Sequence, residues 1–81
     1  MVFYRHVANN PNAPAHLLKN IANYPDIETR CNVARHKNTS TLVLEKLARD
    51  KDISVRQTVA DNPNTSARVL EQISKDNANK D

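Results

Sequence analysis

Residues 53–78 read ISVRQTVADNPNTSARVLEQISKDNA, and this stretch decides the fold because the residues before it repeat it. Residues 27–52, IETRCNVARHKNTSTLVLEKLARDKD, match it at 11 of 26 positions without a gap, and residues 1–26 match it at 8. Unrelated segments would match at about one or two positions, so the similarity marks internal repeats. The 81 residues are therefore expected to form one domain of three repeats with a polar tail over 79–81.

Each repeat is predicted to be a hairpin of two short helices. In the third repeat Val55 and Val59 are four residues apart and share one face of the first helix. Pro63 then interrupts the helix, since proline cannot continue it. The second helix is expected to end near Lys75–Asp76, and its buried stripe is expected to comprise Val69, Leu70 and Ile73.

Hydroxyl side chains are placed to cap the second helix of each hairpin. Thr39 and Thr65 are predicted to be N-caps, whose hydroxyl oxygens accept a backbone N–H, with a serine at the first helical position. Pro14 aligns with those serines, and proline is favoured at the first helical position. Ala13 fills the cap position of the first repeat, where the cap is expected to be weaker.

Acidic and basic residues recur four positions apart at the start of the first helix of repeats two and three. The pairs are Asp26 with Arg30 and Asp52 with Arg56. Each aspartate also lies favourably at a helix N-terminus. The pattern fits either a ladder that links adjacent repeats or two exposed ion pairs of small energetic value.

The repeats resemble the variant leucine-rich repeats, whose pattern is roughly VRxxVAxNPxTPxxxLxxLAxD. VRQTVADNPNTSARVLEQISKD, VANNPNAPAHLLKNIA and TRCNVARHKNTSTLVLEKLARD carry the resemblance, which covers about residues 2–78. They are also similar to HEAT-type repeats. The resemblance implies paired helices, one of which can be 3₁₀ in character, stacked as a right-handed α-α superhelix without a sheet. This chain departs from the pattern at Lys37, which replaces the turn proline, and at Tyr4, which replaces the arginine.

The composition argues against an enzyme. The chain has no glycine, which excludes glycine-rich phosphate-binding loops, and its single cysteine cannot form an internal disulfide. His6 and Cys31 are expected on neighbouring helices, but zinc needs three or four ligands at spacings that are absent here. We therefore predict no catalytic residue, no metal and no cofactor, including the iron–sulfur cluster associated with one member of the resembled family.

Basic residues concentrate in the middle repeat. The candidate interaction surface comprises Arg30, Arg35, His36, Lys37, Arg49 and Lys51. A non-catalytic protein-binding or scaffolding module is the first hypothesis, because helical repeats offer an extended surface. Weak nucleic-acid binding is the alternative, although interspersed acidic residues and a lack of aromatic residues in this repeat argue against it.

Two further expectations concern association and location. Val2 and Phe3 place apolar side chains where a terminal repeat needs a polar outer face, which predicts a homodimer through the first repeat. An inward-folded Phe3 that covers its own repeat is the competing expectation. No membrane-spanning apolar run or signal-peptide pattern occurs, so a cytoplasmic location is expected.

Asn12, Asn38 and Asn64 share one turn position, which Asx-turn hydrogen bonds are sufficient to explain.

Overall fold

The chain folds into helices alone within the part that is described. The computed structural model describes the backbone of residues 2–78 and the side chains of residues 5–76, and no strand occurs between residues 2 and 78. The prediction of an all-α fold is confirmed. The helices are α1 (Val2–Asn9), α2 (Ala15–Ile21), α3 (Ile27–Arg35), α4 (Thr41–Leu47), α5 (Ile53–Ala60) and α6 (Ala67–Ala78).

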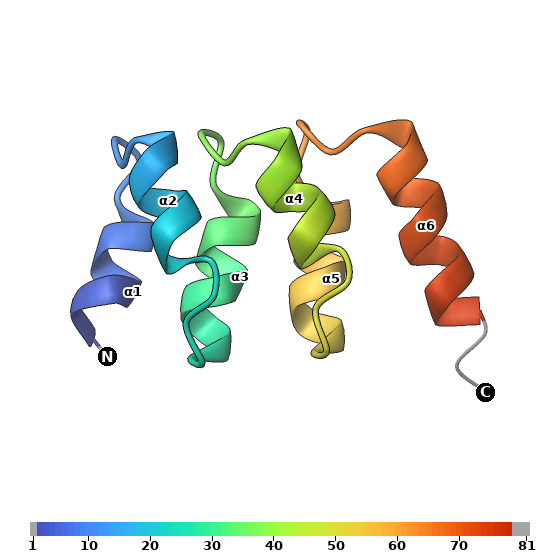
Figure 1. Cartoon of the computed structure of the whole chain (residues 1–81), viewed down its shortest axis with the longest axis horizontal. Helices are drawn as coiled ribbons and strands as arrows, with labels where there is room; N and C mark the ends of the chain where they lie inside the picture. Colours follow the sequence, from blue (N-terminus) through green and yellow to red (C-terminus); the bar gives the residue numbers. More distant parts are fainter. Residues whose placement is uncertain (1, 79–81) are drawn as a thin grey trace.

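The helices follow one another along the longest axis of the molecule, with α1 and α6 at its opposite ends (Figure 1). The extents are 36 × 22 × 16 Å. Helix α3 packs against both α1 and α5, and each of α2, α4 and α6 packs against odd-numbered helices. The even-numbered helices make little contact with one another. The odd-numbered helices therefore form a closely packed row, while the even-numbered helices stand apart on its surface.

The core is a thin layer between these helices and consists mainly of aliphatic side chains. Its fully buried members include Leu18, Val33, Leu44, Leu47, Val55 and Val59. Burial of Val69 and Ile73 in α6 agrees with the predicted stripe, but Leu70 is 40% exposed and that part of the prediction is wrong. Leu18 and Leu44 lie on helices that contact the next hairpin, whereas no helix follows α6 within the described residues.

The predicted caps are displaced by one residue. Ser40, rather than Thr39, is the N-cap of α4, and its hydroxyl oxygen accepts the backbone N–H of Val43 at 3.3 Å. Pro14 is likewise the N-cap of α2 and has an extended backbone (φ −77°, ψ 158°), so it does not occupy the first helical position. Proline fits there because its fixed φ is compatible with this extended conformation.

The threonines instead satisfy carbonyl groups at the end of the preceding helix. The hydroxyl of Thr39 donates to the carbonyl oxygen of Val33 at 2.6 Å, and Thr65 donates to Val59 at 2.6 Å. Each of these carbonyl oxygens also accepts a backbone N–H just beyond the helix, from His36 or Asn62, so each hydroxyl adds a further hydrogen bond at the helix end. Thr39 and Thr65 are therefore equivalent repeat positions, but they stabilise the end of the first helix and not the start of the second.

Candidate binding groove

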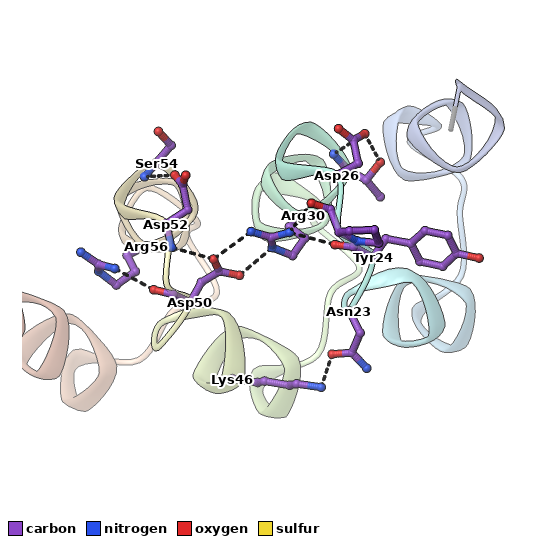
Figure 2. A network of polar contacts seen from close by, with 11 residues as sticks. Asn23, Tyr24, Asp26, Arg30, Lys46, Asp50, Asp52, Ser54 and Arg56 are labelled. Atoms are coloured by element: carbon purple, nitrogen blue, oxygen red, sulfur yellow. Dashed lines mark hydrogen bonds and ion pairs between the residues drawn. The ribbon is translucent and has the colours of Figure 1, made fainter.

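Arg30 is a buried structural residue whose donors are taken up by groups of the protein itself. Its Nε and Nη2 atoms donate to the two carboxylate oxygens of Asp50 at 2.8 and 3.2 Å. Its Nη1 donates to the carbonyl oxygens of Tyr24 and Pro25 at 2.9 and 2.8 Å (Figure 2). Only 6% of Arg30 is exposed, and the hydrogen-bonded Asp50 carboxylate raises the pKa of its guanidinium. The predicted ion pair with Asp26 does not form, because the nearer partner for Arg30 is the carboxylate at the end of its own hairpin.

Asp26 and Asp52 cap helices rather than pair with arginines four residues later. The Asp26 carboxylate accepts hydrogen bonds from the hydroxyl of Thr29 at 2.7 Å and from its backbone N–H at 3.3 Å. Asp52 accepts the backbone N–H of Ser54 at 2.8 Å. The Thr29 hydroxyl lowers the pKa of Asp26 below its ordinary value of 3.8. The stabilising effect of this carboxylate is therefore full above pH 3.8 and is lost as the pH falls through the lower, folded-state pKa.

Arg56 repeats only part of the arrangement around Arg30. Its Nη1 donates to the carbonyl oxygen of Asp50 at 2.7 Å, but its buried Nε has no partner among the residues that the structure describes. Asp76, the equivalent of Asp50, accepts a hydrogen bond from Gln72 instead. Helix α6 continues to Ala78, beyond its predicted end at Lys75–Asp76, and this continuation keeps Asp76 on the helix.

His36 performs the structural role of an asparagine, so its assignment to the interaction surface is wrong. Its Nδ1 accepts the backbone N–H of Asn38 at 2.9 Å, just as the side-chain oxygen of Asn62 accepts the N–H of Asn64 at 2.8 Å. Its Nε2 donates to the carbonyl oxygen of Asn10 at 2.7 Å. The side-chain amide of Asn62 makes the equivalent link to the His36 carbonyl at 3.0 Å. Two ring nitrogens thus replace the oxygen and nitrogen of a side-chain amide.

The four remaining basic candidates are exposed but do not form one patch. Arg35 and Lys37 lie at the turn between α3 and α4, while Arg49 and Lys51 lie at the turn between α4 and α5. These turns are at opposite ends of the helices (Figure 1). The predicted surface is therefore divided, and Arg49 and Lys51 must be considered separately from Arg35 and Lys37.

One hollow of the described surface extends from the turn between α2 and α3, past the end of α4 that carries Arg49 and Lys51, to α6. It has a volume of about 1070 Å³. This groove exists because α6 packs on α5 and makes little contact with α4. The hollow, called the α4–α6 groove below, is lined by Ala22, Asn23, Pro25, Arg30, Leu42, Glu45, Lys46, Leu47, Ala48, Arg49, Asp50, Lys51, Arg68, Val69 and Gln72.

The cationic groups of the groove are not all neutralised by its acidic residues. Asp50 binds Arg30, and Glu45 forms an ion pair with Arg68 at 3.5 Å. Both carboxylates of the lining are thereby engaged. Lys46 donates to the side-chain oxygen of Asn23, which is neutral (Figure 2). Among the described residues, neither Arg49 nor Lys51 forms an ion pair. The groove therefore carries excess positive charge.

Leu42 adds an apolar contact point to this basic groove. It is 74% exposed and lies on a ridge, because it lines both the α4–α6 groove and a smaller hollow of about 450 Å³ beside α2. The equivalent residues of the other repeats are His16 and Arg68. Sequence reasoning missed Leu42, although a leucine at a position that is otherwise polar is a signal that could have identified it.

Cys31 and His6, the residues considered for catalysis, do not line a common hollow in the described residues. The small hollow beside Cys31 is lined by residues of α3 and its N-cap and does not include His6. Within the described part of the chain, no hydrogen bond joins His6 to Cys31, and no cluster of three or more histidine, cysteine, aspartate or glutamate side chains could hold a metal ion.

Comparisons with known proteins assign the chain to no family. No family model, curated protein or solved structure matches the chain. None of the helices in the described residues combines the length and apolar character that crossing a membrane requires. The side chains of Val2 and Phe3 lie outside the described residues, so self-association through them stays a prediction.

Proposed function

We propose that this chain is a non-catalytic binding module built as a short α-solenoid of the variant leucine-rich repeat kind, with a right-handed superhelical stack of three hairpins. Its ligand is an acidic segment of another protein that occupies the α4–α6 groove. The observation that supports this function is the combination, in one hollow, of free cationic groups and a solvent-exposed leucine. The hollow forms because the even-numbered helices α4 and α6 make little contact with each other.

The groove favours a ligand that carries both carboxylates and an apolar side chain. Arg49 and Lys51 lie at one end of the lining and have no ion-pair partner among the described residues, while Leu42 lies along α4. A leucine of the ligand can pack against Leu42 while flanking carboxylates approach the basic turn. An amphipathic helix that lies along a groove presents side chains in this way.

Nucleic acid is the second candidate because the groove is basic. Two observations favour a protein ligand over it. None of the described residues that line the groove is aromatic, so none offers a ring on which a base could stack. The lining also includes the carboxylates of Glu45 and Asp50, which repel phosphates. Phosphate binding would also weaken steeply with salt, because it depends on the release of counterions.

A binding titration tests the proposal with three fluorescent probes of equal length. The first is an acidic amphipathic peptide with leucine flanked by glutamates, the second has glutamine in place of each glutamate, and the third is single-stranded DNA. At physiological salt the acidic peptide should bind at least about tenfold more tightly than either other probe. Tighter binding of the DNA, with a steep salt dependence, would favour the nucleic-acid alternative instead.

Charge-matched variants locate the binding site. Arg49→Glu with Lys51→Glu should weaken binding of the acidic peptide by about tenfold or more, because both charges line the groove. Arg35→Glu with Lys37→Glu makes the same change in net charge at the opposite turn and should change the affinity by less than about twofold. Equal losses in both double variants would contradict a specific groove, since they would show attraction by net charge alone.

A further inference from the structure

The two ends of the described fold expose residues that are buried wherever two hairpins meet. Leu44 is 1% exposed, whereas its equivalent in α6, Leu70, is 40% exposed. At the other end Leu17 is 39% exposed, whereas its equivalents in α4 and α6, Val43 and Val69, are each 6% exposed. One end thus exposes a leucine at the position that is buried where another hairpin follows, and the other end exposes a leucine at the position where the later hairpins bury a valine.

Hydrogen bonds between hairpins show the same asymmetry. The side-chain amide of Asn62 donates to the carbonyl oxygens of Ala34 and His36 in the preceding hairpin, at 2.9 and 3.0 Å. Asn10 is the equivalent residue of the first hairpin. It is exposed, and its side-chain amide nitrogen makes no hydrogen bond within the described residues.

A second asparagine position extends this pattern. Asn38 and Asn64 donate their side-chain amides to the carbonyl oxygens of Ala13 and Lys37, at 3.0 and 2.8 Å. Asn12, the equivalent in the first hairpin, is exposed and its side-chain amide is not used within the described chain. The first hairpin therefore offers two unused donors to a carbonyl-bearing turn like those that follow α1 and α3, and the turn after α5 is the equivalent one in the third hairpin.

The two ends also carry the residues that are equivalent to an ion pair between hairpins. Between hairpins, Arg68 of α6 forms an ion pair with Glu45 of α4. The equivalent of Arg68 in the first hairpin is His16, and the equivalent of Glu45 in the third is Glu71; both are exposed. Stacking the first hairpin of one molecule on the third hairpin of another would bring His16 to Glu71 and convert both exposed leucines into buried ones.

We infer that a second copy of this chain binds head to tail, with its first hairpin stacked on the third hairpin of its neighbour in the manner of successive hairpins within one molecule. Such a contact joins two different surfaces, so each added copy leaves a free end and the assembly can grow beyond a dimer. This inference rests on the proposed equivalence of the three repeats. The contact leaves the residues of the α4–α6 groove unchanged, so an experiment can refute head-to-tail association without refuting peptide binding.

Analytical ultracentrifugation of two end variants tests this inference. Leu17→Glu blocks the first hairpin and Leu70→Glu blocks the third; both sites are exposed in the single molecule, and circular dichroism will confirm that each variant is folded. The unaltered protein should show an average mass that rises with concentration past that of a dimer. Each variant alone should associate about 100-fold more weakly, because a carboxylate would be buried at the contact.

Mixing the two variants gives the decisive result. Leu17→Glu keeps an intact third hairpin and Leu70→Glu keeps an intact first hairpin, so an equimolar mixture should form heterodimers that do not grow further. A twofold contact through the first hairpin predicts instead that Leu70→Glu alone still forms homodimers, and that outcome would overturn the inference. So would an unaltered protein that stays monomeric up to millimolar concentration. Leu42→Glu, in the groove, should associate like the unaltered protein.

Discussion

Replacing Asp50 with asparagine should destabilise the protein by about 3 kcal/mol, because the change leaves a buried guanidinium without its counter-charge. Asp50 and Arg30 side chains are 9% and 7% exposed and share two hydrogen bonds. Asp50 also accepts the backbone N–H of Asp52 at 2.9 Å, which fixes the turn that leads into α5. Urea denaturation should therefore show a lower midpoint, and the melting temperature should fall by roughly 12 to 24 °C.

Asp76→Asn is the matched control for this prediction. Asp76 aligns with Asp50, but among the described residues its side chain accepts a hydrogen bond only from the exposed Gln72 on its own helix. Its replacement should change the free energy of unfolding by less than about 0.5 kcal/mol. A similar loss of stability in the two variants would show that the Arg30–Asp50 pair has no special structural role. A chain of this length is expected to have about 4 to 12 kcal/mol of stability, so the Asp50 variant should remain folded at low temperature.

Replacing Leu44 with alanine should cost about 3 kcal/mol. Leu44 is 1% exposed and lies in the layer where α4 packs on α5, so truncation removes apolar contacts and leaves a cavity. Because the core is only one layer thick, few other side chains are available to fill that cavity. The change in unfolding free energy can be measured by urea denaturation followed by circular dichroism at 222 nm.

The same substitution at Leu70 should cost less than about 1 kcal/mol, since 40% of that side chain is already exposed. The comparison is informative because both residues occupy one repeat position and both lie on the second helix of a hairpin. It should be made at low micromolar concentration, where association between molecules is weakest. Equal costs for Leu44→Ala and Leu70→Ala would contradict the observed difference between the interior hairpin and the last one.

The repeat in the sequence predicted the helical hairpins well, because apolar spacing and helix-breaking turns are local properties. Helices α3 and α5, and helices α2, α4 and α6, begin at the predicted intervals of 26 residues. The cap prediction failed by one residue, because a threonine and a following serine can both serve as N-caps by composition. Only the carbonyl of the preceding helix, which accepts the hydroxyl of Thr39, distinguishes the two.

The candidate site was harder to predict, because a list of charged residues does not show which charges are already satisfied. Arg30 and His36 belonged to the predicted surface, yet both are buried and bound to groups in the neighbouring hairpin or its turn. Arg49 and Lys51 were identified by charge alone and do line the groove. The groove itself depends on how far apart α4 and α6 stand, which no local pattern in the sequence specifies.

Nuclear magnetic resonance mapping of the acidic peptide on the isotopically labelled protein tests the proposed function most directly. We expect the largest shifts in the backbone amides that flank the α4–α6 groove, those of Lys46, Arg49, Lys51, Val69 and Gln72. The amide of Lys37, at the opposite turn, should shift little. Dominant shifts along α1, α3 and α5, or at the turn of Lys37, would contradict the assignment of this groove as the binding site.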